Sequence, residues 1–130
     1  MKMYKKIHSA IRENAESQKC SQLLKLIDIA EGLKLCFLYA YNKQTKDGLI
    51  SCIEVFDEYT YNKFNIKLII VRNKDKMVIN NERVVLNGVT QAQQTYSLVE
   101  LGKLSKRIEN LYRFAQEVEK FNMLKLPVMY

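Results

Sequence analysis

The sequence has 130 residues, of which 48% are hydrophobic and 27% are charged. A chain of this length falls within the range of one domain and can bury a real core, so disorder over most of the length is excluded. The formal charge is +7, from 21 basic and 14 acidic residues that are spread along the chain without a basic block. Such a charge favours contact with nucleic acid or with acidic partners.

Three cysteines, Cys20, Cys36 and Cys52, show no C-x-x-C spacing and leave one thiol unpaired in any disulfide scheme. This usage favours free thiols in a reducing compartment. The start of the sequence lacks the apolar stretch of a signal peptide, and the longest apolar run, LKLCFLYAY, is far shorter than the roughly 20 residues that span a bilayer. We therefore expect a soluble, cytoplasmic protein with no membrane partner.

Residues 3–31 carry apolar side chains at helical spacing. The polar interval ESQKCSQ either continues this helix or breaks it, with Ser17 or Ser21 capping a second helix. Gly32 follows at the position that is typical of a helix C′ glycine. The sequence thus predicts one N-terminal helix or two.

The apolar period changes to two after residue 32. Alternation in LKLCFLYAY predicts one core-facing set, composed of Leu33, Leu35, Phe37, Tyr39 and Tyr41. The runs LISCIEVF, FNIKLIIVR, KMVIN and RVVL follow, separated by short polar connections such as Asp47-Gly48. Every connection is too short for a parallel crossover, so we expect a four- to five-stranded antiparallel meander.

The last long segment is predicted to be one helix that begins with a Thr90-x-x-Gln93 capping box. Its apolar stripe continues across Gly102 and consists of Leu98, Leu101, Leu104, Ile108, Leu111, Ala115 and Val118. From residue 91 to 122 such a helix would be about 48 Å long, whereas a compact domain of this size is about 35–40 Å across. The stripe therefore either packs within its own domain or projects towards a partner. Pro127 ends the regular structure, which gives a single domain at 1–126 and a tail at 127–130.

No combination of residues predicts catalysis, a cofactor or a metal site. His8 is the only histidine and is expected to be solvated on the polar flank of the first helix. Glu54, Asp57 and Glu58 form a tight acidic group, which we interpret as part of a solvated turn in the polar connection DEYTYNK. We therefore expect a protein that is not an enzyme.

Two surfaces are candidates for binding. Basic residues in the strand loops and on the last helix could contact phosphates, namely Arg72, Lys74, Lys76, Lys103, Lys106, Arg107 and Arg113. They could equally form the solvated back of an amphipathic helix and its neighbouring loops. The residues proposed for a protein interface are Leu101, Leu104, Ile108 and Leu111 of the last helix, with Tyr59, Tyr61 and Phe64 of the polar connection.

The sequence thus predicts an α+β domain in which both helix groups cover one face of an antiparallel sheet. We expect a non-catalytic protein-binding module, such as an adaptor, inhibitor or assembly factor, whose partner is another protein or a second copy joined through the C-terminal helix. The alternative is a small basic protein that binds RNA or DNA.

Overall fold

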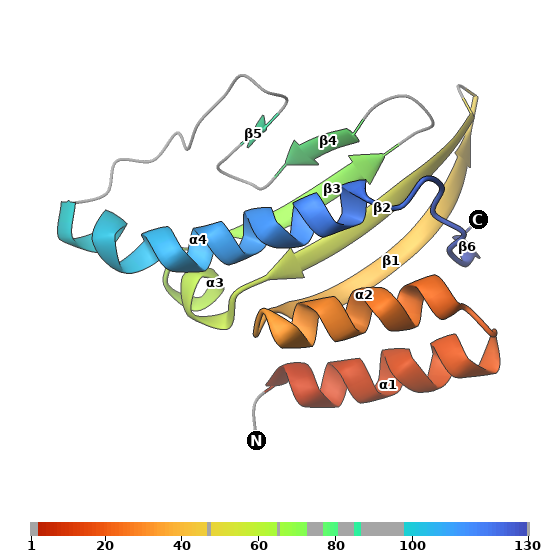
Figure 1. Ribbon diagram of the computed structural model, residues 1–130, viewed down its shortest axis with the longest axis horizontal. Coiled ribbons are helices and arrows are strands. Elements are labelled where there is room, and N and C mark those ends of the chain that lie inside the picture. The colour runs from red at the N-terminus through yellow and green to blue at the C-terminus, as the bar shows by residue number, and fades with distance from the viewer. Residues whose placement is uncertain are drawn as a thin grey trace.

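The computed structural model describes residues 3–46, 48–64, 66–72, 77–80, 85–86 and 98–129. Within these residues the elements follow the chain as α1 (Met3–Ser17), α2 (Ser21–Gly32), β1 (Cys36–Thr45), β2 (Gly48–Phe56), α3 (Glu58–Phe64), β3 (Lys67–Arg72), β4 (Met77–Asn80), β5 (Val85–Leu86), α4 (Leu98–Glu119) and β6 (Val128–Met129). The α+β class is confirmed, with helices before and after the strands (Figure 1).

The N-terminal segment forms two helices, so the alternative with a break is correct. The predicted caps are wrong, because Cys20 occupies the N-cap position of α2 and no side chain caps it. The break is made by the backbone at the end of α1. The amide of Cys20 donates to the carbonyl of Ala15 at 2.8 Å, and Lys19 adopts a left-handed φ of 55°. This is the Schellman arrangement that ends many helices, here with lysine in the position that favours glycine.

The end of α2 repeats this arrangement. The amide of Leu35 donates to the carbonyl of Ala30 at 2.8 Å, and Lys34 has a left-handed φ of 58°. The prediction of Gly32 as the C′ residue is therefore wrong by two positions. Gly32 is the last residue of the helix itself, and a Cβ added to it would meet no atom within 4 Å apart from its chain neighbours and the backbone of its own helix.

The strands of the described residues form one mixed sheet in the order β5-β4-β3-β2-β1-β6. Strands β1 to β4 have four residues or more and pair in an antiparallel meander, while the strands at the two edges, β5 and β6, have two residues each. The prediction of a purely antiparallel sheet is wrong, because β6 pairs with β1 in parallel. The segment predicted as a C-terminal tail therefore contains an edge strand.

A β-bulge changes the faces of β1. The register with β2 shifts between Phe37 and Tyr39, so Phe37 pairs with Val55 whereas Ala40 pairs with Ile53. One extra residue reverses the alternation of side chains along the strand. Tyr39 therefore lies on the face opposite to Phe37, and the prediction that the two residues share a face is wrong.

The hydrophobic core lies between one face of the sheet and the helices α2 and α4. The rings of Phe37 on β1 and Phe114 on α4 have centroids 6.1 Å apart. Fully buried residues of α2, such as Leu26 and Ile27, belong to the same cluster as Ile53 and the other core residues. In Figure 1, α4 crosses in front of the strands, α2 lies beside it, and α1 lies on the outer side of α2. Helices α2 and α4 thus pack on one face of the sheet, and α1 contacts β1 through the hydrogen bond from the amide of Phe37 to His8.

The C-terminal helix is continuous across Gly102, as predicted, and ends at Glu119. The capping box at Thr90 and Gln93 lies outside the described residues. From Leu98 to Glu119 the 22 residues of α4 measure about 33 Å, which is within the width of the domain.

Candidate functional site

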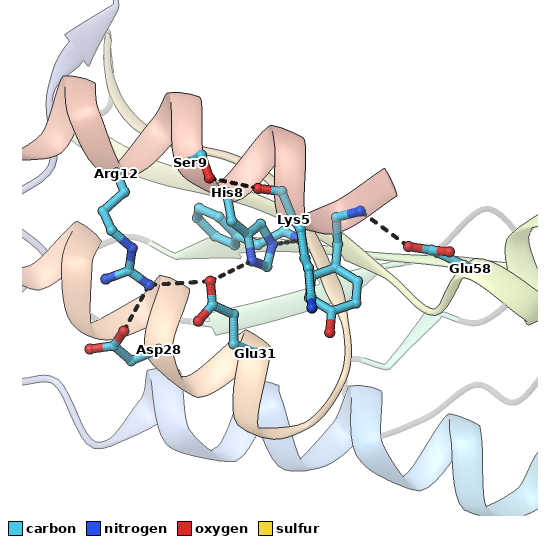
Figure 2. Close-up of polar contacts among 9 residues, drawn as sticks. Lys5, His8, Ser9, Arg12, Asp28, Glu31 and Glu58 are labelled. Carbon is cyan, nitrogen blue, oxygen red and sulfur yellow. Dashed lines mark hydrogen bonds and ion pairs between the residues drawn. The ribbon is translucent and has the colours of Figure 1, made fainter. Parts of the chain in front are cut away.

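The first polar cluster joins α1, α2 and β1 around His8, which is 1% exposed (Figure 2). Its Nε2 accepts a hydrogen bond from the amide of Phe37 at 2.9 Å, and its Nδ1 lies 3.3 Å from Oε1 of Glu31. Because the backbone amide supplies its own hydrogen, the proton of the neutral ring is on Nδ1. The prediction of a solvated histidine is wrong. The sequence offered a signal, since His8 lies seven residues before the fully buried Ala15, on the same side of the helix.

A histidine next to a carboxylate can act as a general base, but this ring has no free acceptor for a substrate proton. Burial lowers the pKa of His8, against the opposing influence of Glu31. Nη2 of Arg12 on α1 lies 2.9 Å from Oδ1 of Asp28 and 3.2 Å from Oε1 of Glu31, so two ion pairs join α1 to α2. The cluster is therefore structural. Because His8 accepts the hydrogen bond of the Phe37 amide, this amide of β1 is not available to pair with another strand.

The second polar cluster begins α3. Oδ1 of Asp57 accepts a hydrogen bond from the amide of Thr60 at 3.0 Å, which makes Asp57 a side-chain cap of this helix. Nη1 of Arg107 lies 2.9 Å from the same oxygen, and its guanidinium carbon is 4.4 Å from the ring centroid of Tyr59. The interpretation of DEYTYNK as a solvated turn is wrong, because it forms a helix and Asp57 and Glu54 are buried.

The structure describes four of the seven side chains that are predicted to contact nucleic acid. Arg107 is held by Asp57, and Nη1 of Arg72 donates to the carbonyl of Val118 at 3.0 Å, near the end of α4. Lys106 and Arg113 are exposed on α4. The side chains of Lys74, Lys76 and Lys103 lie outside the described part of the structure.

Two of the seven residues predicted for a protein interface are buried, three are half-buried, and two have side chains outside the description. Leu104 and Leu111 are buried under α4, at 0% and 1% exposure, and therefore offer no surface to a partner. Ile108 is half-buried. In α3, Tyr61 packs on Phe56 with centroids 4.7 Å apart, and Tyr59 contacts Arg107. The side chains of Leu101 and Phe64 are not among those that the structure describes.

The face of the sheet opposite to the core carries a different set of side chains. We call it the open face and define it by six half-buried residues, namely Tyr39, Tyr41, Ile50, Cys52, Ile69 and Val71. None of them belongs to the core cluster that α2 and α4 cover. The rings of Tyr39 and Tyr41 lie side by side, with centroids 5.3 Å apart. Sequence reasoning missed this face because the bulge at Leu38 is not visible in an unbroken apolar run.

The charges of the open face are unevenly distributed. Glu54 is the only carboxylate on β1, β2 and β3. It is buried, and its Oε1 lies 3.1 Å from Nζ of Lys67. Burial, and then the hydrogen bond to Glu54, raises the pKa of the Tyr39 hydroxyl. Lys43 is exposed at the rim of this face. Among the described residues, the open face therefore has an apolar and aromatic centre, the ion pair of Glu54 with Lys67, and one exposed lysine, Lys43, at its rim.

A groove of about 370 Å³ adjoins the open face between α1, β1 and the segment 127–129. We call it the tail groove. Its walls include Ile11 of α1, Tyr39 and Tyr41 of β1, and Val128 and Met129 of β6. Val128 and Met129 are 47% and 54% exposed, so apolar surface is available at the mouth of the groove.

Comparison of this chain with protein-family models, with curated proteins and with solved structures gives no match. Among the described residues, no three side chains of His, Cys, Asp or Glu gather in a way that could hold a metal ion. No helix in the same part of the chain has the length and hydropathy needed to cross a membrane. All three cysteines are free, with Cys20 and Cys36 buried and Cys52 half-buried.

Proposed function

We propose that this protein is a non-catalytic binding module that docks an acidic protein partner on the open face of its sheet. The observation that carries the proposal is the group of half-buried tyrosines and aliphatic residues that lies outside the core cluster. Aromatic side chains are enriched in protein interfaces, because they bury a large area and lose little conformational entropy. An uncovered apolar sheet face is a typical place for such contacts.

The charges on the open face favour an acidic protein as the partner. The centre of the open face carries no free carboxylate, since Glu54 is paired with Lys67, and Lys43 adds a positive charge at the rim. The whole chain has a formal charge of +7. A surface of this kind attracts an acidic protein and repels a second copy of itself. Leu104 and Leu111 are buried, so these two residues of the α4 stripe offer no contact to a second copy, which supports a different protein as the partner.

Nucleic-acid binding is the second candidate, because adjacent tyrosines can stack on bases. Tyr39 and Tyr41 fulfil this requirement on the open face. The exposed Lys106 and Arg113, however, lie on α4, which covers the other face of the sheet (Figure 1). Phosphates that contacted these side chains would therefore be far from bases stacked on the tyrosines, so the geometry favours a protein partner.

The test uses two matched charge reversals at exposed positions, Lys43→Glu at the open face and Arg113→Glu on α4. Each lowers the net charge by two and leaves the core intact. Wild-type protein and both variants are immobilised and incubated with nuclease-treated lysate of the source cells, and the retained proteins are quantified by mass spectrometry. We expect an acidic protein that is retained by the wild type and by Arg113→Glu, and at least tenfold less by Lys43→Glu.

Equal retention by all three proteins would contradict docking on the open face. The nucleic-acid alternative is measured separately, with labelled RNA, single-stranded DNA and duplex DNA over a salt series. Micromolar affinity near 0.15 M salt with a steep dependence on salt, lost in Arg113→Glu, would replace the proposal with nucleic-acid binding through α4.

A further inference from the structure

We propose that the tail groove receives one uncharged apolar side chain, aromatic or long aliphatic, from the acidic partner of the open face. This inference rests on the proposed function and specifies how the partner is anchored. The groove and the open face share Tyr39 and Tyr41, so a protein that covers these two residues also covers the mouth of the groove.

The lining of the groove determines the chemistry of the anchor. No charged residue contributes to it, and the lining residues with polar side chains are Asn14, Gln18, Tyr39 and Tyr41. Burying a charge in such a place without a partner is costly, whereas an apolar side chain gains from leaving water. The volume of about 370 Å³ is at the lower end of the range for ligand pockets, about 300–1,000 Å³, and exceeds what one large side chain requires.

The surroundings of the groove determine the sequence that flanks the anchor. Lys43 pairs in register with Met129 on one wall, and Lys19 follows Gln18 at the end of α1. On α1 the groove is lined by Ile11, Asn14 and Gln18, and the exposed carboxylates of this helix are on other faces, because successive residues are 100° apart. Acidic residues beside the anchor would therefore meet lysines and no carboxylate of α1.

Hot spots of protein interfaces are typically aromatic or large side chains that insert into a pocket near a polar rim. The tail groove resembles this arrangement, because Tyr39 and Tyr41 belong to its lining, Lys43 pairs in register with the lining residue Met129, and Lys19 follows the lining residue Gln18. The exposed Val128 and Met129 complete the wall, and the two-residue pairing of β6 holds them there.

The first experiment tests the groove without the partner. The full chain labelled with ¹⁵N is titrated with N-acetyl-tryptophanamide, N-acetyl-leucinamide and, as a charged control, N-acetyl-lysinamide. We expect saturable amide shifts at millimolar concentration for the residues of the groove with the first two compounds and no saturable shifts with the third. Shifts that are absent, or that scatter over the whole surface, would overturn the inference.

The second experiment uses variants of α1. Asn14→Trp fills the groove from an exposed position, and Ser9→Trp places the same side chain on the opposite side of the helix as a matched control. We expect Asn14→Trp to abolish the shifts and to reduce capture of the acidic partner at least tenfold, with an unchanged melting temperature, while Ser9→Trp behaves as the wild type. Undiminished capture by Asn14→Trp together with loss in Lys43→Glu would refute the anchor and leave the proposed function standing. Undiminished capture by both variants would refute the proposed function as well.

Discussion

Acidification should destabilise this protein through His8. Burial lowers the pKa of this residue below its ordinary value of 6.5, although the hydrogen bond and the charge of Glu31 act in the opposite direction. Below pH 6.5 the unfolded chain therefore binds a proton more readily than the folded chain does. The stabilisation is complete above pH 6.5 and is lost as the pH falls from 6.5 towards the lower pKa of the folded state.

The contacts of His8 explain why the free energy of unfolding falls, and the linkage relation gives the size of the fall per pH unit. Each pH unit between the two pKa values removes about 1.4 kcal/mol from the free energy of unfolding. Protonation places a hydrogen on Nε2, to which the amide of Phe37 already donates at 2.9 Å. The buried amide then has no acceptor, which costs about 1–3 kcal/mol. The sequence has a single histidine, and carboxyl groups of model peptides titrate near pH 4, so the window between pH 6.5 and 5 is chosen to report on His8.

The assay is urea unfolding at pH 7.5, 6.5, 5.5 and 5.0 for the wild type and for His8→Gln, which has no titratable group at this position. We expect the midpoint of the wild type to fall between pH 6.5 and 5.0 with an unchanged m-value, and that of the variant to stay constant over the same range. A fall of equal size in both proteins, or a wild type that gains stability on acidification, would refute the role assigned to His8.

Four other predictions concern a helix end, a helix cap, the C-terminal segment and the cysteine thiols. Lys34→Gly should raise the free energy of unfolding by about 0.5–1 kcal/mol, since glycine adopts the left-handed conformation without steric cost, and a lower melting temperature would contradict this. Asp57→Ala should cost about 1–2 kcal/mol in chemical unfolding and Asp57→Asn less, because asparagine retains the cap; equal losses would exclude capping as the cause. Nδ2 of Asn42 donates to the carbonyls of Leu124 and Leu126, so Asn42→Leu should lower the free energy of unfolding by about 2–3 kcal/mol and speed hydrogen exchange in β6. Unchanged exchange would show that the segment is held by other contacts. An aromatic disulfide reagent at pH 8 should label Cys52 first, because Cys36 is buried and burial raises its pKa to about 11. Peptide mapping identifies the labelled thiol, and modification of Cys36 before Cys52 would contradict the burial.

The longer elements of the fold could be predicted from the sequence, because their apolar periods extend over many residues. The helix after Leu98 is an example, since its stripe continues through Val118 without a change of phase. The short helix α3 could not be found in this way, because seven residues are too few for a helical period to be distinguished. Its cap was nevertheless visible, as Asp57 stands directly before Glu58, at a position that favours aspartate.

The candidate site could not be predicted, because it depends on two local events in β1. The bulge at Leu38 lies within a run in which every residue is apolar, so no polar residue marks the change of face. The parallel pairing of Val128 with Asn42 joins residues far apart in the sequence, and a two-residue strand carries no period of its own. The bulge moves Tyr39 and Tyr41 from an expected core position to the open face, and the pairing of β6 with β1 brings Val128 and Met129 to the tail groove beside them.

The closure of β1 by the C-terminal segment also has a consequence for synthesis on the ribosome. The side chain of Asn42 donates to the carbonyl of Leu124, which is translated 82 residues later. At about 5–20 residues per second, this delay lasts about 4–16 s. Throughout that time the nascent chain has β1 but not the strand that covers its outer edge beyond α1. The edge is therefore open to a chaperone, or to mispairing with a neighbouring nascent chain, until the last residues of α4 and the segment after it have emerged.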